Sequence, residues 1–74
     1  MSEKAEILFM QTRIIRLASD KWHLSVEKVL TLFEKANILD YIETGYGIFH
    51  CEGDEVVLED IEEFMQRKGI EISA

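Results

Sequence analysis

The 74-residue chain has room for one small domain with a single hydrophobic core, since 47% of its residues are apolar and 31% are charged. Fifteen acidic residues against eight basic ones give a net charge of −7, which disfavours a nucleic-acid binder, because such proteins carry a basic stripe. The chain contains no apolar run of membrane-spanning length and no recognisable secretory leader, and its single cysteine, Cys51, cannot form an internal disulfide. We therefore expect one cytoplasmic domain over residues 1–74, with no membrane association.

The charges are divided unevenly along the chain. Residues 1–37 contain five acids and six bases, whereas residues 38–74 contain ten acids and two bases. A surface of one sign can steer a protein toward a partner of the opposite sign, although it also keeps a small protein soluble. The second half is therefore a candidate docking surface for a basic protein.

The first predicted element is an amphipathic helix over residues 4–22. Its apolar residues fall on one half of a helical wheel, and Ser2 can cap its start. Two residues break the pattern: Gln11 lies in the apolar arc, where its amide needs hydrogen-bond partners, and Phe9 lies on the polar side. Phe9 is either a lone exposed ring or part of a contact surface.

The second predicted helix spans residues 26–36. Ser25 can cap its start, and Asn37 suits the left-handed residue that ends a helix. The link over residues 23–25 is so short that the first two helices must pack as neighbours.

Residues 38–58 allow two interpretations. Helical spacing of apolar residues predicts a helix near 39–48, although Gly45 and Gly47 each weaken it by about 1 kcal/mol. Alternatively, residues 46–58 form a short β-hairpin with its turn at residues 52–54.

The last predicted helix spans residues 57–68, with acids in its first turns, basic residues in its last turn and Gly69 at its end. The chain as a whole is predicted to be a mostly α, single-domain bundle of about four helices, with the possibility of the hairpin. The predicted core consists of Ile7, Leu8, Ile14, Ile15, Ala18, Trp22, Val29, Leu30, Phe33, Ile42, Tyr46, Phe49, Ile61 and Phe64.

Three polar residues are candidates for structural anchors. Asp60 borders the apolar stripe of the last helix, so we expect it to accept hydrogen bonds from backbone amides, Tyr46 or His50. Tyr46 and His50 would then tie the third segment to the last helix.

No residue pattern indicates an enzyme, a metal or a cofactor. His50 and Cys51 are adjacent, but neighbours on a regular element point apart, so a base would not reach the thiol. With His23 they do not have the spacing of a metal site. The carboxylates of Glu59 and Glu63 share a solvent-facing side of the last helix, without the apolar surroundings that would suit them to acid–base chemistry.

A DNA-binding regulator is the alternative function. Helices at 26–36 and 39–46 joined by a short turn imitate a helix-turn-helix, and a hairpin after them would imitate a wing. The second of these helices carries Asp40 and Glu43 and no basic residue, so DNA phosphates would repel it.

A set of ordered residues resembles a small uncharacterised bacterial family catalogued as domain of unknown function 3791. The resemblance covers about residues 5–66 and is carried by Val29-Leu-Thr-Leu-Phe-Glu-Lys35, Ile38-Leu-Asp-Tyr-Ile42, Tyr46, Phe49-His50, Gly53, Val57 and Glu59-Asp-Ile61. It implies no catalytic residues. It does imply a genomic context, because members are often encoded near an ADP-ribosyltransferase-like protein. This context suggests that the chain is an accessory or antitoxin-like partner of the protein encoded beside it.

From these features we expect a non-enzymatic protein-interaction module with a basic protein partner, and a homodimer in solution. The expected interaction surface comprises Phe9, Leu32, Glu59, Glu62 and Glu63.

Overall fold

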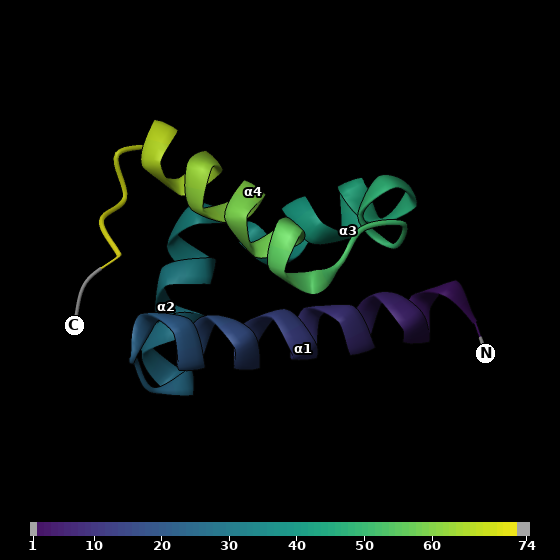
Figure 1. Ribbon diagram of the computed structural model, residues 1–74, viewed down its shortest axis with the longest axis horizontal. Helices are drawn as coiled ribbons and strands as arrows, with labels where there is room; N and C mark the ends of the chain where they lie inside the picture. Colours follow the sequence, from purple (N-terminus) through teal and green to yellow (C-terminus); the bar gives the residue numbers. More distant parts are fainter. Residues whose placement is uncertain (1, 73–74) are drawn as a thin grey trace.

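The computed structural model describes residues 2–72, which form four helices. They are α1 (Glu3–Trp22), α2 (Val26–Ala36), α3 (Ile38–Phe49) and α4 (Asp54–Arg67). In Figure 1, α1 runs the length of the molecule along one edge, α2 leads away from its end, and α3 and α4 cover the opposite edge. The predicted mostly α bundle of four helices is confirmed.

The ends of the helices follow the capping residues in the sequence. The hydroxyl of Ser2 accepts a hydrogen bond from the amide of Ala5 at 3.2 Å, and that of Ser25 accepts one from the amide of Lys28 at 3.1 Å. Asn37 is left-handed with φ 57°, so α2 ends and α3 begins at this single residue. The predicted bounds of α2 are confirmed without change.

The alternative β-hairpin over residues 46–58 is wrong. Helix α3 continues to Phe49, a turn follows over residues 50–53, and α4 begins at Asp54, three residues earlier than predicted. Extended Gly53 precedes α4, and the acids Asp54 and Glu55 in its first turn favour this start because they face the positive end of the helix dipole.

Gly45 is required inside α3 by the packing of Phe49. A Cβ atom at residue 45 would lie 2.5 Å from Cε2 of Phe49, whose buried ring lies against the bare backbone one turn before it. Gly47 has nothing within 4 Å of the equivalent position. The two glycines that made α3 uncertain in the sequence therefore differ in role.

The core lies where the apolar faces of all four helices meet. It consists of Met10, Ile14, Ala18, Leu24, Val29, Leu32, Phe33, Ala36, Ile38, Ile42, Phe49, Val57, Leu58, Ile61 and Met65. Of the predicted core residues, Ile7, Ile15, Trp22, Tyr46 and Phe64 are half-buried.

Two core predictions are wrong: Leu8 is 59% exposed, and Leu30 is exposed as well. Both belong to the apolar arc of their helix, but they lie at its margin, beyond the part that neighbouring helices cover. Within residues 2–72, no helix is both long and apolar enough to cross a membrane.

Candidate functional site

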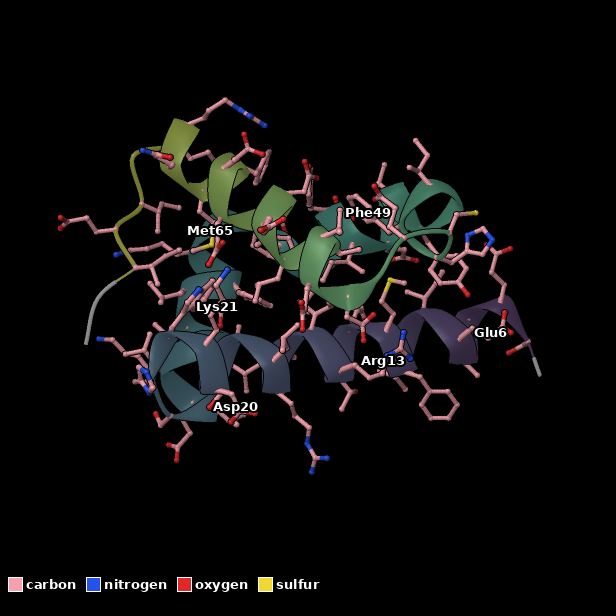
Figure 2. All side chains as sticks on the ribbon, in the orientation of Figure 1. Glu6, Arg13, Asp20, Lys21, Phe49 and Met65 are labelled. Carbon is pink, nitrogen blue, oxygen red and sulfur yellow. The ribbon has the colours of Figure 1, made fainter. Side chains whose placement is uncertain are left out.

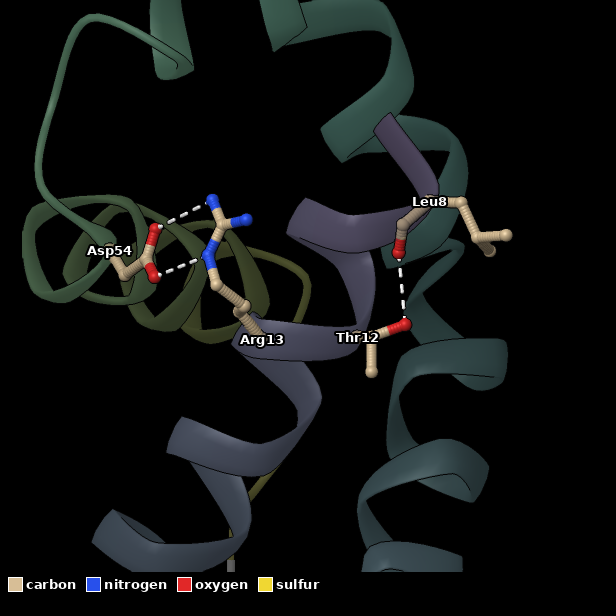
Figure 3. A network of polar contacts seen from close by, with 4 residues as sticks. All are labelled: Leu8, Thr12, Arg13 and Asp54. Atoms are coloured by element: carbon tan, nitrogen blue, oxygen red, sulfur yellow. Dashed lines mark hydrogen bonds and ion pairs between the residues drawn. The ribbon is translucent and has the colours of Figure 1, made fainter. Parts of the chain in front are cut away.

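Two carboxylates of α4, those of Asp54 and Glu62, form ion pairs with α1. Figure 2 shows Arg13 and Lys21 rising from α1 toward α4. Nε of Arg13 lies 2.9 Å from Oδ2 of Asp54. Figure 3 shows this pairing, and its hydrogen bond raises the pKa of Arg13. Nζ of Lys21 lies 3.0 Å from Oε1 of Glu62.

Glu62 also accepts a hydrogen bond from the indole Nε1 of Trp22 at 2.7 Å. This residue was predicted on the interaction surface, on the solvent side of α4. The structure instead places its carboxylate between two donors of α1, which leaves it poorly available to a partner.

The other side of α4 lines an open groove against α3. We call it the α3/α4 groove; its volume is about 510 Å³, and it is lined by Tyr41, Thr44, Gly45, Ile48, Phe49, Glu52, Val56, Glu59, Asp60 and Glu63. Four of these residues are acidic and none is basic. We call the apolar lining residues Ile48, Phe49 and Val56 the floor of the groove, and the carboxylates of Glu52, Glu59 and Glu63 its rim.

The wall of the groove is held by one hydrogen bond between α3 and α4. The hydroxyl of Tyr41 donates to Oδ2 of Asp60 at 2.6 Å, and the Tyr41 ring stacks on Phe64 with centroids 4.2 Å apart. Burial, followed by the hydrogen bond to Asp60 and its negative charge, raises the pKa of Tyr41 to about 12. Asp60 is therefore a structural anchor, but its partner is Tyr41.

The predicted ties from Tyr46 and His50 to Asp60 are wrong. The hydroxyl of Tyr46 lies 3.4 Å from Oε2 of Glu6 on α1, and the His50 ring stacks on Tyr46 with centroids 5.1 Å apart. Nδ1 of His50 lies 2.9 Å from the backbone oxygen of Tyr46. Both residues line a hollow with Glu6 and Arg13, so they face α1 rather than α4.

Sequence reasoning missed Tyr41, although a signal was present. Tyr41, Gly45 and Phe49 recur at intervals of four residues, which places them on the side of α3 that faces α4. The aromatic pair of Tyr41 and Phe49, with centroids 5.6 Å apart, follows from this spacing.

The remaining predicted surface residues are not brought together. Leu32 is only 7% exposed and belongs to the core, so its assignment to an interaction surface is wrong: it faces the final segment, where it shares a hollow with Ile70. Phe9 is 49% exposed and borders a separate hollow. Only Glu59 and Glu63 line the α3/α4 groove.

The expectation that His50 and Cys51 point apart is also wrong. Sγ of Cys51 lies 3.7 Å from Nε2 of His50, because the two residues follow the end of α3 in a turn rather than within a regular element. Both side chains are exposed. Within residues 2–72, no group of three or more potential ligands could hold a metal ion.

The fold and the groove define a small all-α protein whose most distinctive surface is anionic. The family described as "Protein of unknown function (DUF3791)" matches residues 9–68, and the chain belongs to this family. No curated protein and no solved structure matches the chain.

Proposed function

We propose that this protein is a non-enzymatic interaction module whose acidic half docks on a basic protein partner. The single observation that carries the proposal is the division of charge on α4. Two of its carboxylates are paired with cations of α1, whereas Glu59 and Glu63 form no ion pair within residues 2–72. Unpaired charge of one sign around an apolar floor suits a charged partner better than it suits the stability of the fold.

The partner that we propose is the product of a neighbouring gene, bound in an accessory or antitoxin-like role in the cytoplasm. The genomic context of the family supports this choice, and a net charge of −7 suits a basic partner. A homodimer is a further proposal; with Leu32 in the core, Phe9 is the remaining exposed apolar residue of the surface predicted for it.

DNA binding receives less support from the same helices. Only Asn37 separates α2 from α3, which is shorter than the usual turn of a helix-turn-helix, and α3 carries Asp40 and Glu43 without a basic residue. No hairpin follows α3 within the described part of the chain, so the winged form of this interpretation has no wing.

Co-purification tests the proposal. The tagged chain is expressed with the product of the adjacent gene, and the complex is isolated at low salt and then challenged with increasing salt. We expect a complex of fixed stoichiometry that weakens as salt rises, because screening reduces the attraction between opposite charges. Absence of a complex, together with salt-sensitive binding of random duplex DNA, would contradict the proposal and favour the regulator.

A further inference from the structure

Two exposed aliphatic side chains lie on the floor of the α3/α4 groove. Ile48 is 72% exposed and Val56 is 48% exposed, and both line the groove with the buried ring of Phe49. Gly45 lines the groove as well, and its lack of a side chain lets the Phe49 ring pack against the backbone there. Covering these atoms removes apolar surface from water, so the floor favours a ligand with an apolar side chain.

The rim of the groove presents carboxylates with a regular spacing. Glu59 and Glu63 are four residues apart on α4, which places them one helical turn, or about 6 Å, from one another. Glu52 adds a third carboxylate just before α4 begins. Like charges at this spacing repel, and no ion pair within residues 2–72 relieves the repulsion.

We infer that the α3/α4 groove binds a basic amphipathic segment of another polypeptide. The segment places an apolar side chain on Ile48 and Val56, and its lysines or arginines, one helical turn apart, pair with Glu59 and Glu63. This inference rests on the proposed function and names the site and the chemistry of the partner.

Other occupants fit the groove less well. A second copy of the chain also carries a charge of −7, so electrostatic repulsion opposes its approach. A small polyamine satisfies the rim but leaves the apolar floor uncovered. A basic segment with an apolar face is complementary to both parts at once.

The test uses a fluorescent synthetic peptide of about 15 residues, in which leucines recur at helical spacing and lysines flank them. Binding is followed by fluorescence anisotropy against the full chain. A peptide of the same composition in scrambled order and the polyamine spermine serve as comparison ligands. We expect the amphipathic peptide to bind saturably, and both comparison ligands to bind at least about tenfold more weakly.

Two matched pairs of variants locate the contact. The double variant Glu59→Lys with Glu63→Lys should weaken binding of the peptide at least about tenfold. The control is Glu27→Lys with Glu34→Lys, which makes an equal change of charge at exposed residues of α2. It should change binding less than about threefold. Ile48→Ser should weaken binding in the same way, whereas Leu8→Ser, at an exposed leucine of α1, should not. Circular dichroism checks that every variant is folded.

Equal binding of the scrambled peptide or of spermine, equal loss in both charge-reversed pairs, or absence of saturable binding would overturn the inference. Association of the chain with itself that is lost in Ile48→Ser would assign the groove to a second copy instead. The proposed function is tested separately. If the groove variants still form a salt-sensitive complex with the adjacent gene product, the chain is an interaction module, but its partner does not bind in the α3/α4 groove.

Discussion

The two long sides of α4 use their carboxylates differently. Toward α1, Asp54 and Glu62 lie 2.9 and 3.0 Å from the cations of Arg13 and Lys21. Toward α3, the rim of the groove has acids and no base. Net charge alone therefore does not locate a binding surface in this protein, because some acids are paired within the fold and others are left available.

The same two sides differ in their apolar packing. The side facing α1 contributes residues that are completely buried, such as Ile61. On the groove side Val56 is 48% exposed, and Ile48 of α3, which lines the same groove, is 72% exposed. Truncating an isoleucine should therefore lower the free energy of unfolding far more on the α1 side than in the groove. This is the largest effect that we expect.

Ile61→Ala should lower the free energy of unfolding by about 2–5 kcal/mol, because it creates a cavity in a closed core. Ile48→Ala should change the free energy of unfolding by less than about 0.5 kcal/mol. Urea denaturation followed by circular dichroism measures both. Similar losses in the two variants would show that the groove is closed in solution and that the comparison fails.

The two glycines of α3 provide a second contrast. Gly45→Ala should destabilise the protein by about 1–3 kcal/mol, because its Cβ meets the confined ring of Phe49. Gly47→Ala should stabilise it by up to about 1 kcal/mol, since alanine favours a helix and the site is open. Thermal and urea unfolding test the opposite signs; a gain in both variants would mean that Phe49 rotates away at little cost.

Burial of Tyr41, together with its hydrogen bond to Asp60, makes the stability of the protein fall at high pH. The pKa of Tyr41 is about 12 in the folded chain, compared with about 10 in an unfolded one, so its contribution is complete below pH 10 and is lost as pH rises toward 12. Asp60→Asn should lower the pKa of Tyr41, yet keep it above 10, because burial is the larger cause. Titration of the tyrosinate absorbance, with Tyr46→Phe as the background, measures the shift. An unchanged titration in Asp60→Asn would contradict the role of this pair.

Neutralising single carboxylates should give the smallest changes in stability, but their opposite signs test directly whether the two sides of α4 differ in charge pairing. Glu62→Gln should destabilise the protein by about 1 kcal/mol, because it weakens the contacts with Lys21 and Trp22. Glu63→Gln should stabilise it by about 0.2–0.5 kcal/mol at low salt, since it removes repulsion from Glu59. Unfolding measured at low and high salt checks both signs. Destabilisation by Glu63→Gln would indicate that this carboxylate has a partner within the fold.

The helical architecture follows from the amino-acid sequence, because the signals for it are local. Hydrophobic spacing defined the helices, and Ser2, Ser25 and Asn37 defined three of their boundaries through capping and a left-handed turn. Residues 38–58 were ambiguous for the same reason: Gly45 and Gly47 weaken the local helical signal, and only packing against Phe49 explains Gly45.

Tertiary structure alone decided which side of each helix serves the core, which serves an ion pair and which remains open. Leu32 and Leu8 both belong to apolar stripes, yet one is buried and the other exposed, because burial depends on where a neighbouring helix lies. Glu62 and Glu63 are adjacent acids, but only one of them meets Lys21 across the bundle. The partner of Asp60 was likewise beyond local patterns, since its hydrogen bond with Tyr41 joins residues nineteen apart whose contact depends on the angle between α3 and α4.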